Sequence, residues 1–192
     1  MFLFFRPTDE QIRDYLYRQQ ESPFSYADVG ATREAAAPAG YIVDHNRAQL
    51  GSGNVAWHLA KQAISEWKMF NFPWLQLCWP TVAIQRGVTV AVAISHFGFW
   101  SVNPSRIVYI VQEDRRFGFA YGTLKDHSES GEERFLVEWN ETDNSVWYDL
   151  SAFSRPNAML AKLAQPLARG LQKRFRQDSM RAMAEAVNRG LA

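Results

Sequence analysis

The chain contains one cysteine, Cys78, in 192 residues. A single cysteine excludes an internal disulfide, and no group of cysteines and histidines has the spacing of a zinc site. We therefore expect no metal and no cofactor, and a reducing compartment such as the cytoplasm. Leu77 and Trp79 flank Cys78, and no adjacent cation is present to activate the thiol. The expectation is a packed, unreactive cysteine.

An excess of one charge and a long apolar run are also missing. The 21 basic residues nearly balance the 20 acidic residues, so nothing favours a nucleic-acid partner, which is held by phosphate neutralisation. No stretch approaches the roughly 18 apolar residues of a membrane span. The opening MFLFF stops at Arg6 and Pro7, too early for a signal peptide. These absences predict a soluble protein with a single domain over residues 1–192.

Aromatic residues are abundant, at 14% of the chain, with 13 Phe, 7 Trp and 7 Tyr. Aromatic side chains bury much apolar area and fill protein cores, but they also line pockets for small molecules. Tryptophans in strands are usually core residues, and an aromatic cage for a cation is the alternative. Composition does not choose between these interpretations.

The first third of the chain mixes helical and strand patterns. Residues 8–20 have a Thr8 cap and apolar residues at helical spacing, which predicts a helix. Residues up to 40 are rich in proline and glycine and predict a surface excursion. Residues 41–50 begin like a strand, and residues 52–69 form an amphipathic helical pattern.

The periodicity then changes to two. Six short runs are rich in β-branched and aromatic residues and are separated by turn chemistry. They span residues 75–78, 87–96, 105–113, 116–124, 132–139 and 146–153. Short connections between consecutive strands favour an antiparallel meander. Residues 156–187 carry an apolar stripe opposed by a basic stripe and predict a long helix. Pro166 predicts a kink near residues 162–165.

This order of elements predicts an α+β fold in which a curved antiparallel sheet wraps around the long C-terminal helix. It resembles the helix-grip fold of the START and birch-pollen-allergen (SRPBCC) superfamily, which encloses a hydrophobic pocket. Motifs carry a closer resemblance, which extends over nearly the whole chain. They are PFSYADVGATR (23–33), YIVDHNR (41–47), RIVYIVQED (106–114), RFGFAYGTL (116–124), HSESGEERFLVEW (127–139), VWYDLSAFSRP (146–156) and QKRFRQDSMRAM (172–183). These strings are similar to the domain of unknown function 1990 family. That resemblance implies no activity and no catalytic residues, because none is established for the family.

Alternation along the strands predicts which side chains share a face. Glu133 shares a face with Phe135, and Tyr121 and Thr123 share one with Phe119. We expect these faces to point toward the long helix. Glu129 and Glu132 are interpreted as solvated turn residues.

A buried carboxylate needs a partner. By the same alternation Arg106 and His96 lie on inner faces, and we expect Arg106 to pair with Glu133. Two interpretations stay open: an internal ion pair that sets strand register, or the polar floor of a pocket whose ligand packs on Phe119, Tyr121 and Phe135.

Histidines supply further candidates. His45 shares the face of Tyr41 and Val43 and is either a pocket residue or a structural histidine. His127 lies in a loop, from which it would serve as a base only if it met Glu133. His58, on a helix, is expected at the surface.

Three hypotheses follow for function. The first is a protein that binds a small apolar or amphipathic ligand between sheet and helix. The second is an enzyme that uses Glu133 with His45 or His127 as acid and base. The third is an interaction module that docks through the basic stripe of the terminal helix.

Overall fold

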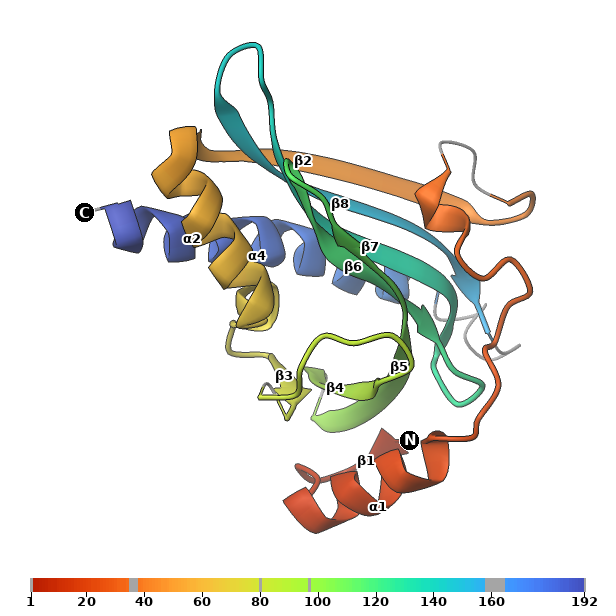
Figure 1. Ribbon diagram of the computed structural model, residues 1–192. Helices are drawn as coiled ribbons and strands as arrows, with labels where there is room; N and C mark the ends of the chain where they lie inside the picture. The colour runs from red at the N-terminus through yellow and green to blue at the C-terminus, as the bar shows by residue number, and fades with distance from the viewer. Residues whose placement is uncertain (1, 35–37, 80, 97, 158–164, 192) are drawn as a thin grey trace.

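The computed structural model describes residues 2–34, 38–79, 81–96, 98–157 and 165–191 and shows a curled antiparallel sheet with helices on both faces (Figure 1). The strands are β1 (Phe2–Leu3), β2 (Ile42–Ser52), β3 (Leu75–Cys78), β4 (Thr89–His96), β5 (Phe99–Gln112), β6 (Arg116–Thr123), β7 (Glu129–Trp139) and β8 (Ser145–Pro156). The helical elements are α1 (Asp9–Gln19), η1 (Ala31–Arg33), α2 (Gly53–Ser65), η2 (Lys68–Phe70) and α4 (Gln165–Leu191).

The sheet runs in the order β2-β8-β7-β6-β5-β4-β3, and the short β1 pairs with β5. Strands β3 to β8 are therefore sequential neighbours, and the predicted antiparallel meander is confirmed. Strand β2 closes the other edge by pairing with β8. Helices α2 and α4 pack on one side of the sheet, which we call the inner face. Helix α1 and the loop of residues 24–33 cover the opposite, outer face.

The main core lies on the inner face, where the predicted alternation of β6 and β7 is confirmed. Phe119 and Phe135 are fully buried, and their stacked rings lie 5.2 Å apart. Trp67 and Phe70 pack on them from the α2 side, with ring distances of 4.9 and 5.3 Å. Burying such a side chain contributes about 2–3 kcal/mol. The sheet and α2 are thus joined by packed aromatic rings rather than by a hollow.

A smaller core on the outer face holds α1 against β4 and β5. Thr8 caps α1 as predicted, since its hydroxyl accepts from the Gln11 N–H at 3.2 Å and the Gln11 side chain accepts from the Thr8 N–H at 3.0 Å. Ile12 packs beside Cys78, which is buried as predicted. Burial raises the pKa of the Cys78 thiol to about 11, so the thiol is not activated.

Several element boundaries differ from the sequence predictions, and the differences at β5 and at the start of the last helix are the largest. Strand β5 begins at Phe99 rather than at residue 105 and includes Pro104. Proline loses a donor but not an acceptor, and the Pro104 carbonyl accepts from the Leu124 N–H at 3.1 Å. The predicted helix start at residue 156 is wrong, because Pro156 still pairs with Glu129 in the sheet. The kink predicted near residues 162–165 falls almost entirely outside the described residues.

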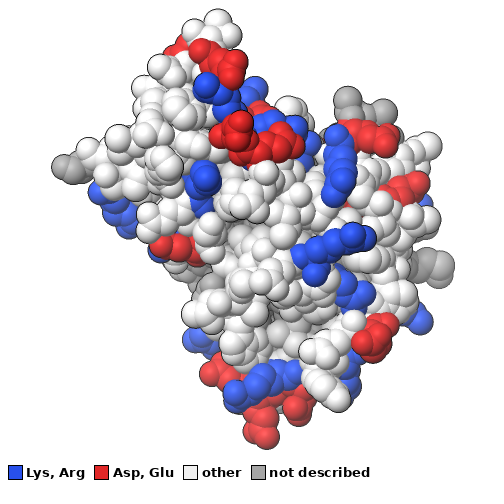
Figure 2. All heavy atoms as spheres, viewed as in Figure 1, with Lys and Arg blue, Asp and Glu red and all other residues white. Residues whose placement is uncertain are grey.

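Charges of both signs are interspersed over the face of the molecule shown in Figure 2. None of the helices among the described residues combines the length and apolar character that crossing a bilayer requires.

Candidate functional site

A cavity of about 510 Å³ lies between the inner face and the first half of α4. Two kinds of lining occupy different parts of the sheet. Apolar side chains come mainly from the β3–β4–β5 side and from α4, and include Trp74, Leu75, Ile94, Phe99, Leu171 and Phe175. Charged side chains come from β2, β7 and α4, and include Asp44, Glu129, Glu133 and Arg176. The cavity is therefore amphipathic, with its carboxylates on one half of the curled sheet.

Glu133 stands at the centre of the charged half. Cross-strand pairing sets Asp44, Ala152, Glu133 and Tyr121 in one row on the inner face. The Tyr121 hydroxyl donates to Glu133 Oε2 at 2.9 Å. Burial raises the pKa of Glu133 to about 7, although the Tyr121 hydrogen bond and the Arg176 charge oppose the shift. This carboxyl is poised to exchange a proton near neutral pH.

Asp44, at the end of the same row, is held by two arginines of α4. Arg169 donates to both carboxylate oxygens, at 2.7 and 3.0 Å, and Arg176 Nη1 lies 3.0 Å from Oδ2. The Arg169 hydrogen bond is the main cause that holds the pKa of Asp44 below its usual range. The ion pairs fasten α4 to the edge strand β2 and leave Asp44 ionised.

Sequence reasoning missed Asp44 and Arg176. Leu50 is buried in the inner core, so counting back along β2 in steps of two residues places Asp44 on the inner face. The sequence carried this signal only weakly, because β2 has polar residues on both faces and the burial of Leu50 is seen only in the structure. The position of Arg176 on the helix was not decidable without knowing which part of α4 meets β2.

The loop between β6 and β7 contributes His127 and leads to Glu129 at the start of β7. Nδ1 of His127 lies 2.9 Å from the backbone nitrogen of Glu129 and 3.1 Å from its carbonyl oxygen. Burial lowers the pKa of His127 to about 4, so the imidazole is neutral at physiological pH. Burial also raises the pKa of Glu129. The interpretation of Glu129 as a solvated turn residue is wrong, since it lines the cavity.

The same interpretation is wrong for Glu132, which is only 2% exposed. It points to the outer face, where Tyr26 Oη and the Gly30 N–H each donate to Oε2 at 2.7 Å. The Thr32 N–H donates to Oε1 at 3.0 Å, and the Thr32 hydroxyl also donates to Oε1. Glu132 thus anchors the loop of residues 24–33 onto the sheet.

The predicted ion pair between Glu133 and Arg106 is wrong. Arg106 stands opposite Gly122 and Thr89 in a row that faces outward, whereas Glu133 belongs to the next, inward row. The Arg106 guanidinium caps α1 by donating to the Gln19 carbonyl at 2.9 Å. Ile107, its neighbour, is the inward residue and is 1% exposed.

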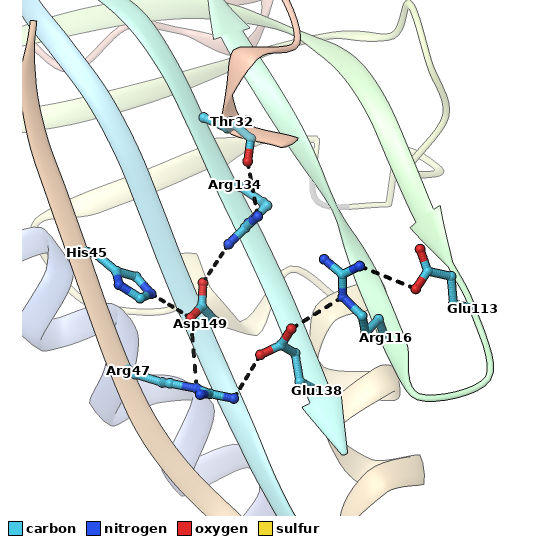
Figure 3. Close-up of polar contacts among 8 residues, drawn as sticks. All are labelled: Thr32, His45, Arg47, Glu113, Arg116, Arg134, Glu138 and Asp149. Carbon is cyan, nitrogen blue, oxygen red and sulfur yellow. Dashed lines mark hydrogen bonds and ion pairs between the residues drawn. The ribbon is translucent and has the colours of Figure 1, made fainter. Parts of the chain in front are cut away.

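His45 also lies on the outer face, and its predicted place in a pocket is wrong. Its side chain is 57% exposed, and Nε2 lies 2.6 Å from Asp149 Oδ2. Arg134 reaches the other oxygen of Asp149 at 3.0 Å, and Arg47 continues toward Glu138 (Figure 3). His45 therefore belongs to a surface network that ties β2, β8 and β7 together.

The remaining candidates divide between the cavity and the core. Tyr121 and Thr123 line the cavity, but the Thr123 hydroxyl is occupied by Ser25 at 2.6 Å and by the Gly131 N–H at 2.9 Å. Phe119 and Phe135 are buried in the core. The side chain of His96 lies outside the described residues, and His58 is exposed as predicted.

Comparisons with known proteins agree with this architecture. A UPF0548 protein of Dictyostelium discoideum is 34% identical over 207 residues, which cover 97% of this chain and 96% of the relative. One from Deinococcus radiodurans is 34% identical over 198 residues, covering 97% and 99%. Norcoclaurine synthase of Thalictrum flavum, solved as a point mutant with a transition-state analogue, superposes with a TM-score of 0.51 at 13% identity, over 82% of this chain and 100% of that chain.

The likeness to norcoclaurine synthase is one of fold and confirms the predicted helix-grip architecture. The sequence profile of the family described as "Domain of unknown function (DUF1990)" matches residues 25–182, which is most of the chain. On this match and on its UPF0548 relatives, the chain belongs to the DUF1990 family.

Proposed function

We propose that this protein binds a small amphipathic molecule in the cavity between the inner face and α4. The observation that carries the proposal is the cavity of about 510 Å³, which lies within the range of about 300–1,000 Å³ typical of small-molecule sites. Its walls are mostly apolar, and a few polar groups converge on one side. That division matches a ligand with an apolar body and a polar end.

Helix α4 supplies one wall of this site. Phe175 faces the cavity and packs against Phe70 and Phe72, with ring distances of 5.6 and 5.8 Å. On the sheet side, Ala152 is a small residue in the row between Asp44 and Glu133. A small side chain at this position keeps the space open, so it offers a direct test.

Substitution of Ala152 by Phe is expected to fill the cavity and abolish binding. Binding is measured by the fluorescence of N-phenyl-1-naphthylamine, a neutral apolar probe, and by native mass spectrometry of copurified ligand. The matched control is Ser151→Phe, because Ser151 is the adjacent β8 residue opposite Arg134 on the outer face. Unchanged binding in Ala152→Phe, with Ser151→Phe also unaffected, would refute the proposal.

An acid–base enzyme is the second candidate, and the pKa of about 7 at Glu133 favours it. His45 cannot take part, because it lies on the outer face. His127 lines the same cavity in its neutral form, but its described hydrogen-bond contacts are to the Glu129 backbone and not to Glu133, so Glu133 is the acid–base group of this candidate. Loss of turnover in Glu133→Gln with binding retained would distinguish this candidate, and unchanged turnover would rule it out.

Docking through the basic stripe of α4 has less support. Arg169 and Arg176 are directed to Asp44 at the cavity side of the helix. Arg174 and Arg181 flank Asp178 of the same helix, at 3.6 and 2.6 Å. The stripe is therefore partly neutralised by the protein's own carboxylates.

A further inference from the structure

Glu133 differs from Asp44, the other carboxylate in its row, in how few partners it has. It accepts one hydrogen bond, from Tyr121, and forms no ion pair with any side chain that the structure describes. Asp44 receives two guanidinium groups. An ionised carboxylate has about four acceptor positions. Glu133 therefore retains acceptor capacity on the wall of the cavity.

The charges around Glu133 favour a cation over an anion. The groups that interact with its charge are Asp44 from β2, Tyr121 from β6, Tyr148 from β8 and Arg176 from α4. Glu129 from β7 and His127 from the β6–β7 loop line the same cavity, and Arg169 from α4 contacts Asp44. Both arginines contact Asp44, and His127 is neutral. The three carboxyl groups outnumber the two guanidinium groups, so a further negative charge would be repelled once Glu133 ionises.

We infer that the ligand of this cavity carries an amine, and that its ammonium group binds the Glu133 carboxylate. The inference rests on the proposed function and names its ligand class: amphipathic amines with an apolar body. Desolvation of a carboxylate without a contacting cation is costly, and an ammonium would supply that contact, since Arg176 acts on Glu133 only from a distance and no described cation forms an ion pair with it. The Tyr121 hydroxyl, a permanent donor because burial raises its pKa well above the usual range, orients the carboxylate for this contact.

The apolar body would lie on the rings of Trp74, Phe99 and Phe175. Two of these rings are themselves fixed. Trp74 Nε1 donates to Asp178 at 2.7 Å, and Phe175 packs on Phe72. A rigid apolar wall in the same cavity as a carboxylate suits an arylalkyl amine better than a polar amine.

The test uses three probes with one naphthalene body and different heads, titrated into the full-length protein by calorimetry. They are 2-(1-naphthyl)ethylamine, 2-(1-naphthyl)ethanol and 1-naphthylacetate. At pH 8 the amine should bind about tenfold more tightly than the alcohol, because hydrogen bonds to ionised groups are the stronger ones. The acetate should bind most weakly.

Protonation of Glu133 supplies a second readout. Its pKa of about 7 makes the ionised fraction rise between pH 6 and pH 8, while the amine stays cationic. Amine affinity should rise about tenfold over this interval, and alcohol affinity should stay constant. Glu133→Gln should remove both the amine preference and its pH dependence. The matched control Glu138→Gln, on the same strand but in the outer-face network with Arg47 and Arg116, should keep both. Glu129→Gln tests the other β7 carboxylate of the cavity.

The outcomes separate the two proposals. If the alcohol binds and the amine binds no more tightly at pH 8, the amine inference is refuted and the proposed function stands. If none of the three probes binds, both are refuted. If Glu129→Gln rather than Glu133→Gln abolishes the preference, Glu133 is not the recognition group. Should Glu133→Gln fail to fold, the pH series on the unsubstituted protein still tests the inference, because a flat amine affinity between pH 6 and pH 8 refutes it.

Discussion

Glu132 and Glu133 are consecutive residues of β7 with opposite environments. Glu132 faces outward and receives hydrogen bonds from Tyr26, Gly30 and Thr32. Glu133 faces inward and receives one, from Tyr121. The outer carboxylate is satisfied by the protein itself, whereas the inner one stands on the wall of a cavity with unused acceptor positions. A buried structural carboxylate has its acceptor positions filled by donors of the same protein. A carboxylate with unfilled acceptor positions beside a cavity is a candidate for ligand recognition.

The largest effect is expected from the outer residue. Glu132→Ala would remove the acceptor of the Gly30 and Thr32 N–H groups and of the Tyr26 hydroxyl, and unsatisfied buried donors cost about 1–3 kcal/mol each. We expect a loss of about 3 kcal/mol in the free energy of unfolding, measured by urea denaturation. A loss no larger than that of a conservative surface substitution would remove the structural role assigned to Glu132.

Glu133→Gln is expected to act in the opposite direction. The pKa of Glu133 is raised from 4.5 to about 7 in the folded state, so the native protein binds this proton more tightly than the unfolded chain does. The stability that comes with the proton is present below pH 4.5 and is lost as the pH rises through about 7.

A neutral glutamine side chain at this position would not show this loss. The variant should therefore be more stable than the unsubstituted protein at pH 8, by about 1–2 kcal/mol after allowance for water in the cavity, and similar to it near pH 4.5. Unfolding curves at both pH values check this. Equal destabilisation of the variant at both would contradict the assignment.

The smallest effect is expected at His45. Its side chain is 57% exposed, and its partner Asp149 keeps Arg134 at 3.0 Å. A polar contact from so exposed a side chain contributes about 0–1 kcal/mol, and Asp149 stays paired with Arg134, so His45→Ala should change the unfolding free energy by less than about 0.5 kcal/mol. It should also leave binding of N-phenyl-1-naphthylamine unchanged. An effect on binding would mean that the outer network is coupled to the cavity.

Alternation succeeded where one face of a strand is strongly apolar. Phe119 and Tyr121 on β6, and Phe135 beside Glu133 on β7, were placed correctly. The opposite assignment of faces would expose these large apolar side chains to solvent. It failed at His45 and Arg106. Strand β2 carries polar residues on both faces, so its pattern did not tell inward from outward. In β5 a β-bulge between Ile107 and Tyr109 shifts the register, so Arg106 does not share the face of Ile110 as strict alternation predicts.

Glu132 could not have been placed from β7 alone. Its partners come from residues 26–32, about 100 positions earlier, in a loop with no periodic pattern. The same holds for the pairing of Asp44 with Arg169, 125 positions apart. Interactions between such distant segments depend on how the chain closes in space and leave no local trace.

Local chemistry was enough to predict the order of the elements, the meander, the cap of α1, the aromatic core of β6 and β7 and the inward direction of Glu133. Each depends on propensities and periodicities that act over a few residues. The partners of the charged groups, and the hollow that remains between α4 and the sheet, arose only when strands from opposite ends of the chain came together. Packing and burial depend on how side chains from distant parts of the chain fill a shared space, and local sequence patterns do not specify this.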